Sequence, residues 1–129
     1  MARTDFEERR VYRSAEKLAD EIWDMVAIWD PFAKATVGEQ VVDAADSVGA
    51  NIAEDAGRGS YQQNRHFVRI ARGSLYEAKH FLRRAYRRKL VDDEQAGRLK
   101  PILDELAPSL NAYLRSIGSR RRDGDAADD

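Results

Sequence analysis

The chain has 129 residues, of which 43% are hydrophobic and 35% charged, and its formal net charge is −1. This length supports one ordinary domain, and no apolar run approaches the roughly 20 residues needed to span a bilayer. The lack of cysteine excludes disulfides, thiol nucleophiles and thiolate metal sites. Since the N-terminal residues do not resemble a signal peptide either, we expect a cytoplasmic protein.

Apolar residues recur every three or four positions in four segments, which is the period of an amphipathic helix. The pattern predicts helices over residues 5–30, 37–56, 60–89 and 93–117. The first two apolar stripes are Val11, Ala15, Leu18, Ile22, Met25 and Trp29, and then Val41, Ala45, Val48 and Ile52. The third is Phe67, Ala71, Ser74, Ala78, Phe81 and Ala85, and the fourth is Ala96, Leu99, Leu103, Leu106, Leu110, Tyr113 and Ile117.

Each predicted helix begins near a capping box, in which a short polar side chain and an acid or amide three residues later bond the first backbone N–H groups. The four pairs are Thr4 with Glu7, Thr36 with Glu39, Ser60 with Gln63, and Asp92 with Gln95. Because each pair lies where the apolar period restarts, we take the four pairs to mark the helix starts.

The connections between the predicted helices are short, and no segment alternates with the period of a strand. Short connections force consecutive helices to lie antiparallel. We therefore predict an all-α, antiparallel up-down-up-down four-helix bundle over residues 1–117. Pro101 and Pro108 should kink the last helix or break its first turns, and the charged residues 118–129 should form a disordered C-terminal tail.

Charge is divided unevenly along the chain. Residues 58–89 hold ten Lys or Arg and one acid, whereas the rest of the chain holds 12 basic and 22 acidic residues. Six cations lie on one flank of the third predicted helix, with Tyr76 filling the gap in their spacing. This basic stripe consists of Arg65, Arg69, Arg72, Lys79, Arg83 and Arg87. Only Glu77 offers it an opposite charge on the same helix, so the stripe needs a partner elsewhere.

Two explanations fit the basic stripe. Its cations either pair with acids on other helices, or they bind a polyanion, because arginine forks match phosphate oxygens. The candidate acids are Glu16, Asp20, Asp24, Asp43 and Asp46. Charge alone leaves both explanations open.

No catalytic or metal-binding pattern accompanies the stripe. His66 and His80, the only two histidines, would lie about 21 Å apart along a helix, too far to share one ion. No phosphate-binding glycine loop, nucleophile–base pair or carboxylate dyad is evident. We therefore expect no enzyme activity, no metal and no cofactor.

Ser47, Asn51 and Glu54 share one face of the second predicted helix. They could form a small polar site with Arg58, but we favour a structural role, in which these side chains bond backbone groups and a neighbouring helix.

Gly49 and Gly73 lie inside helices, where glycine costs about 1 kcal/mol relative to alanine. Close approach of the second and third helices would explain them.

Two blocks carry a family resemblance. The run from Ala45 to Glu54, ADSVGANIAE, followed by Gly57 and Arg58, resembles the signature S-x-x-x-N-I-A-E-G-x-G-R, and the run from Arg69 to Glu77, RIARGSLYE, resembles a second block, I-A-x-G-S-L-x-E. Both are typical of the four-helix bundle proteins encoded in intervening sequences of bacterial 23S rRNA genes. Ser47, Asn51, Glu54, Arg58, Gly73 and Ser74 are the matching positions. More distantly, the chain is similar to the accessory variability protein of diversity-generating retroelements.

The resemblance covers residues 6–117 and implies a four-helix bundle that assembles as a homopentamer. It also implies nucleic-acid binding and, from the retroelement relatives, a reverse transcriptase as a candidate partner. The chain departs from the pattern at Asp55, where the family has glycine, and at Val42 and Asp43, which occupy a position often basic in relatives. The difference at Val42 and Asp43 removes positive charge from the second predicted helix.

The resulting hypothesis is a non-enzymatic nucleic-acid-binding or scaffold protein that contacts RNA or DNA phosphates through the basic stripe. The alternative is a protein–protein interaction module whose stripe is an internal or partner-facing salt-bridge surface. Either would act as a homo-oligomer, because the chain has more aromatic residues than the apolar stripes can hold, and surplus aromatics commonly fill interfaces. The aromatic residues concerned are Trp23, Trp29, Phe32, Tyr61 and Tyr86.

Overall fold

The computed structural model describes residues 3–56 and 61–128, and within them every regular element is helical. The elements are α1 (Arg3–Ala27), the short α2 (Pro31–Ala33), the π-helical turn η1 (Lys34–Gly38), α3 (Glu39–Ala56), α4 (Tyr61–Arg87) and α5 (Asp93–Asp128). The predicted all-α fold is confirmed, and four long helices form the bundle.

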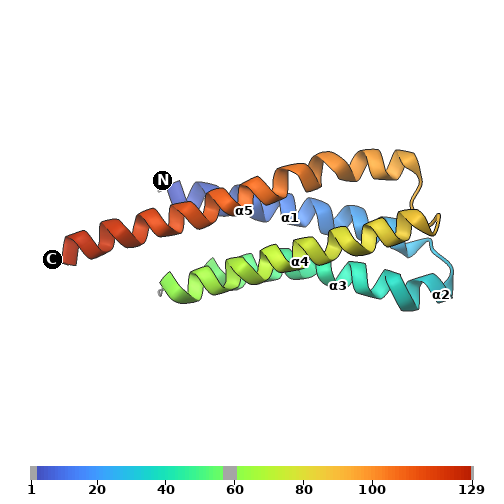
Figure 1. The fold of residues 1–129 in the computed structure, drawn as a ribbon, viewed down its shortest axis with the longest axis horizontal. Coiled ribbons are helices and arrows are strands. Elements are labelled where there is room, and N and C mark those ends of the chain that lie inside the picture. The colour runs from blue at the N-terminus through green and yellow to red at the C-terminus, as the bar shows by residue number, and fades with distance from the viewer. Residues whose placement is uncertain (1–2, 57–60, 129) are drawn as a thin grey trace.

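The four long helices pack in a square arrangement. In the described part of the chain, α1 packs against α3 and α5, and α4 also packs against α3 and α5, so α1 and α4 are diagonal. Figure 1 shows each long helix running back along the one before it, with both ends of the chain at the same end of the bundle. The groove between α1 and α3 therefore lies on the opposite side of the bundle from the groove between α4 and α5.

The core follows the predicted stripes in three of the helices. All six stripe residues of the first segment are buried, including Trp29 beyond the end of α1, and so are all four of α3. In α5 the stripe from Leu99 to Ile117 is buried or packed against the core, and Ala96 packs against it too. These buried side chains supply the main stabilisation, at roughly 25 cal/mol per Å² of apolar surface.

The buried apolar row of α4 differs from the predicted one. Its buried apolar positions are Val68, Ala71, Leu75, Ala78, Leu82 and Ala85, whereas Phe67 and Phe81 are only half-buried. Both rows share the alanines at 71, 78 and 85, so helical spacing alone fits either. The larger aromatic rings lie at the edge of the core.

Helical turns already precede α3 in residues 31–36, which the prediction left between two helices. Asp30 caps the short helix α2, since its Oδ1 accepts a hydrogen bond from the backbone N–H of Ala33 at 3.0 Å, and Pro31 follows as the first helical residue. Thr36 is inside the π turn, and its hydroxyl donates to the Phe32 carbonyl at 2.8 Å. The predicted capping role of Thr36 is therefore wrong, because the Asp-Pro pair presets a helical turn six residues upstream. The long helix α3 itself begins at Glu39, two residues after the predicted start at residue 37.

Gly38 closes the π turn at a point where two segments come very close. A Cβ added to Gly38 would lie 2.9 Å from Val26 Cγ1 and 3.0 Å from the Ala33 carbonyl oxygen. Only glycine fits without displacing a side chain of α1 or the backbone of α2, so Gly38 fixes how closely the second helix can approach the end of α1.

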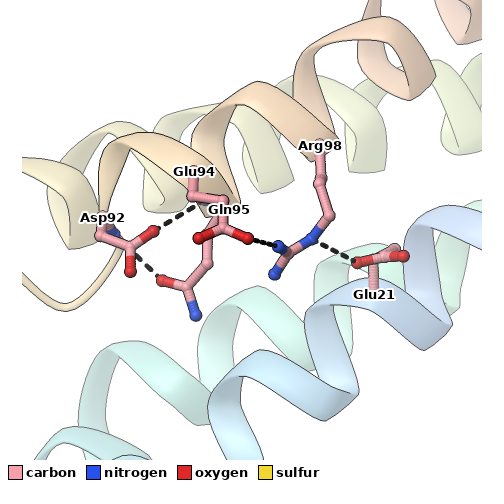
Figure 2. Close-up of polar contacts among 5 residues, drawn as sticks. All are labelled: Glu21, Asp92, Glu94, Gln95 and Arg98. Atoms are coloured by element: carbon pink, nitrogen blue, oxygen red, sulfur yellow. Dashed lines mark hydrogen bonds and ion pairs between the residues drawn. The ribbon is translucent and has the colours of Figure 1, made fainter.

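The capping box at the start of α5 is confirmed. The backbone N–H of Gln95 donates to Asp92 Oδ1 at 2.8 Å, and the backbone N–H of Asp92 donates to Gln95 Oε1 at 3.0 Å. Figure 2 shows this pair beside Arg98, which bonds Glu94 at 3.0 Å and reaches Glu21 of α1 at 3.8 Å. These are exposed pairs, worth at most about 1 kcal/mol each, so they orient α5 more than they stabilise it.

The other two helix starts lie at the edges of the described ranges. Ser60 lies outside the described residues, and α4 begins at Tyr61. The first helix begins at Arg3, one residue before its predicted cap at Thr4.

The prediction of a disordered tail after residue 117 is wrong for the described residues, because α5 continues to Asp128. No described glycine has a positive φ, so Gly118 does not terminate the helix. The helix also runs through Pro101 and Pro108 without a break.

Candidate nucleic-acid interface

The basic stripe follows one flank of α4. Arg65, Arg69, Arg83 and Arg87 are exposed, whereas Arg72 and Lys79 are half-buried at the edge of the bundle. The buried row of α4 lies beside the stripe, so the aliphatic stems can rest on the bundle while the charged ends reach solvent. The predicted residues thus share a continuous surface of one helix.

The stripe cations have no acidic partner within the described part of the chain. The ion pairs found there join Arg10 to Glu7, Arg98 to Glu21 and Glu94, and Lys100 to Asp104. Within the described residues, the Lys79 ammonium lies over an aromatic ring instead, 5.8 Å from the centre of the Tyr76 ring. Internal pairing is therefore not what holds these side chains.

The acids that could have paired with the stripe gather elsewhere. Asp20 of α1 and Asp43 and Asp46 of α3 are close enough to act on one another. Partial removal from water raises the pKa of Asp46, and the negative charges of Asp43 and Asp20 raise it further. Burial and like charges are thus the causes that prevail at Asp46, which places the three acids near one another. The acidic cluster thus belongs to the α1–α3 side of the bundle, away from α4.

A groove borders the C-terminal half of the stripe. It has a volume of about 1010 Å³ and lies between α4, the turn that follows it, and the first turns of α5. Lys79, Arg83 and Arg87 line it from α4, and apolar side chains such as Leu99 and Leu103 line it from α5. The C-terminal half of the stripe therefore lies beside α5.

Tyr86 lies at the edge of this groove and was not singled out as a site residue from the sequence. Half of its surface is exposed, and its hydroxyl donates to Asp93 Oδ1 at 2.6 Å. This hydrogen bond and the charge of Asp93 raise the pKa of the Tyr86 phenol, so the group stays protonated. The bond holds the ring between two helices, which the sequence did not indicate.

The turn after α4 brings a further cation to the groove. Lys89 has a φ of 65°, and the backbone N–H groups of Lys89 and Leu90 donate to the carbonyls of Tyr86 and Ala85 at 3.0 and 2.9 Å. These bonds close the helix in a Schellman motif, whose left-handed position glycine usually occupies. Here a lysine that lines the groove occupies it instead.

The two signature blocks meet between α3 and α4. The Asn51 side-chain amide donates to the Ser47 carbonyl at 2.8 Å and to Ser47 Oγ at 3.0 Å, and Ser74 Oγ of α4 donates to Ser47 Oγ at 2.9 Å. The network matches the structural role that we favoured for Ser47 and Asn51. Glu54 is exposed and has a partner of its own, and Arg58 lies outside the described residues.

The model of the 23S rRNA-intervening sequence protein family matches residues 7–112. The chain belongs to this family. A crystal structure of a protein of unknown function from the S23 ribosomal protein family of Bacteroides thetaiotaomicron is 19% identical, with a TM-score of 0.73 over 88% of this chain and 99% of that one. That likeness concerns the fold alone. The search of curated proteins gave no match.

The family match contains both signature blocks and the whole basic stripe, but the last part of α5 lies beyond it. In this member of the 23S rRNA-intervening sequence family, the hydrogen bonds of Ser47, Asn51 and Ser74 join α3 to α4. The signature thus fixes the helix that carries the stripe.

The predicted close approach at Gly73 is wrong. An added Cβ would meet nothing within 4 Å at Gly73, and at Gly49 it would touch Ala15 and Tyr12 of α1 at an ordinary 3.7 Å. Gly49 therefore faces α1 rather than α4, and neither glycine is required by helix packing in this subunit.

Replacing Gly73 with alanine should therefore stabilise the protein. Alanine gains about 0.5–1 kcal/mol over glycine in an exposed helix interior, and nothing in the subunit opposes the extra methyl group. We expect thermal unfolding followed by circular dichroism to show a melting temperature a few degrees higher. A lower melting temperature at unchanged oligomer size would contradict the open space around Gly73.

The described residues were also compared with the requirements of a metal site and of a membrane-spanning helix. In the described residues, no group of three or more His, Cys, Asp or Glu side chains could hold a metal ion. Each histidine instead packs edge-on against the phenylalanine that follows it, His66 with Phe67 and His80 with Phe81. None of the described helices has the length and apolar character required to cross a membrane.

Proposed function

We propose that this member of the 23S rRNA-intervening sequence family is a non-enzymatic protein that binds RNA or DNA through the basic stripe of α4. The observation that supports this proposal is the lack of ion pairs in the stripe. Six cations share one flank of a helix, and within the described residues none of them has an acidic partner. A phosphate backbone supplies a row of negative charges for such a surface.

The proposed contacts are mainly to phosphates rather than to bases. Cations spaced along one face of a helix follow a backbone, and they do not converge on the edge of one base pair. The proposal therefore predicts little sequence specificity. It includes action in the cytoplasm and, from the resemblance to retroelement accessory proteins, a reverse transcriptase as a candidate protein partner.

The proposal also includes a homo-oligomer, with five copies taken from the family resemblance. Trp29 and Tyr61 are no longer part of the argument, because Trp29 is buried and Tyr61 packs against the core. Trp23, Phe32 and Tyr86 remain 61%, 78% and 50% exposed, and Ile28 is exposed as well. Exposed large apolar side chains of this kind favour an interface. Repetition of the stripe in an oligomer would add weak contacts as avidity.

Light scattering at micromolar concentration tests the assembly. We expect a mass about five times that of the 14.7 kDa chain, unchanged when the salt concentration rises, because an interface built on apolar side chains responds weakly to salt. A monomer in this experiment would refute the assembly, whatever the result of the binding experiment.

Salt dependence tests the binding. If each subunit contacts about four phosphates, the logarithm of the affinity for a single strand should fall with the logarithm of the salt concentration at a slope of roughly −3. Fluorescence anisotropy of a labelled oligonucleotide measures this slope. If the protein retains neither RNA nor DNA at low salt, the stripe instead serves a protein partner.

A further inference from the structure

The two halves of the basic stripe have different surroundings. Lys79, Arg83 and Arg87 form one wall of the groove of about 1010 Å³, whereas Arg65 and Arg69 do not line it. The interior is largely apolar, with buried or half-buried side chains of both helices and of the turn. These are Leu82, Val91, Ala96, Leu99 and Leu103.

Charge is arranged differently on the two walls. The α4 wall carries three cations without ion pairs, and Lys89 adds a fourth from the turn. The α5 wall carries Asp92, Asp93 and Asp104, and its one cation, Lys100, is bonded to Asp104 at 2.9 Å. Phosphates are therefore attracted to the α4 wall and repelled from the α5 wall.

This asymmetry favours one phosphate backbone over two. Lys79, Arg83 and Arg87 follow one another at four-residue steps, about 6 Å each along the helix. A single backbone can follow that row. The second backbone of a duplex would have to approach the acidic α5 wall, where like charges oppose it. A single strand meets no such opposition.

Aromatic rings accompany the cations. Tyr76 and Tyr86 are 54% and 50% exposed, and both lie on the same helix as the row of cations. Tyr86 lines the groove, and its hydrogen bond to Asp93 holds the ring there. Unpaired bases stack on such rings with little regard to sequence, whereas the bases of a duplex are already stacked on one another.

We propose that the α4–α5 groove binds single-stranded nucleic acid, with phosphates along Lys79, Arg83 and Arg87 and unpaired bases against Tyr86 and the apolar interior. The inference rests on the proposed function and deepens it. It assigns the C-terminal half of the stripe to a strand whose bases are free, and it gives Tyr86 a role in binding that charge alone does not predict.

Fluorescence anisotropy at low salt tests the inference, with a labelled oligothymidine of about 20 nucleotides and a mixed-sequence duplex of the same length as probes. We expect the single strand to bind at least about tenfold more tightly than the duplex. Tyr86→Ala should weaken single-strand binding about tenfold and leave duplex binding nearly unchanged, because only unpaired bases use the ring. Tyr12→Ala, which removes another exposed tyrosine on the distant α1, is the matched control and should bind like the wild type.

The outcomes separate the inference from the proposed function. Equal affinity for the two probes, or unchanged single-strand affinity in Tyr86→Ala, overturns the inference alone. Binding of neither probe overturns both. A change in oligomer size in Tyr86→Ala, seen by light scattering, assigns the groove to a second copy of the chain and also overturns the inference.

If Tyr86→Ala loses helicity, Arg83→Gln takes its place, because Arg83 is exposed and makes no hydrogen bond among the described residues. Arg83→Gln should then weaken single-strand binding severalfold, and unchanged affinity overturns the inference.

Discussion

Replacing Arg65, Arg69 and Arg83 with glutamate should reduce nucleic-acid affinity at least about 100-fold at 0.1 M salt. The three side chains are exposed and have no ion pair among the described residues, so the change reverses three charges of the stripe without breaking an internal contact. Each lost phosphate contact also removes the counterion release that drives binding. Fluorescence anisotropy gives the affinity, and circular dichroism and light scattering should give the same helicity and oligomer size as for the wild type.

The matched control for this variant reverses three exposed cations elsewhere. Arg13, Lys34 and Arg115 lie outside α4 and are exposed, so their replacement with glutamate gives the same net charge as the stripe variant. We expect this control to lose less than about tenfold in affinity, through general charge alone. An equal loss in both variants would mean that net charge, and not the stripe, controls binding. A stripe variant that falls apart into monomers would make the stripe a subunit interface.

Replacing Gly38 with alanine should destabilise the protein by about 1–3 kcal/mol. The added Cβ would lie 2.9 Å from Val26 Cγ1, 3.0 Å from the Ala33 carbonyl and 3.4 Å from Trp29 Cε3. Two of these neighbours are buried side chains and one is backbone, so none can move cheaply. The loss should lower the melting temperature by about 5 °C or more, as measured by circular dichroism.

Gly73→Ala is the natural control for Gly38→Ala. Both variants gain the same helix propensity, but a Cβ at Gly73 meets nothing within 4 Å. Opposite signs of the two stability changes would therefore isolate the steric effect at Gly38. If both variants raise the melting temperature, the approach of η1 to α1 is looser than the distances indicate.

Much of the fold could be predicted from the sequence because most helices have a single continuous apolar row. The stripes of α1 and α3 were predicted residue by residue, and so was the capping box of Asp92 and Gln95. Prediction failed where two local patterns compete. Thr36 and Asp30 are both acceptable caps, and the choice depends on Pro31 and on packing around Gly38, which is not visible in local sequence.

The candidate site was predictable only in part for a similar reason. Helical spacing put the six cations of the stripe on one flank of α4, but it could not say whether Asp20, Asp43 and Asp46 would face them. That depends on which helices are diagonal in the bundle. The groove and the role of Tyr86 depend on how α5 packs beside α4, together with a turn in which a lysine takes the left-handed position.

The separation of acids on the α1–α3 side from cations on α4 gives the subunit a transverse electric dipole, although its net charge is only −1. A polyanion that comes close therefore exerts little net attraction on the subunit, but it exerts a torque that turns α4 towards itself. Since fields are screened over about 10 Å at 0.1 M salt, this alignment acts only during the final approach. Salt should consequently affect the fraction of encounters that are correctly oriented, and not only the lifetime of the complex.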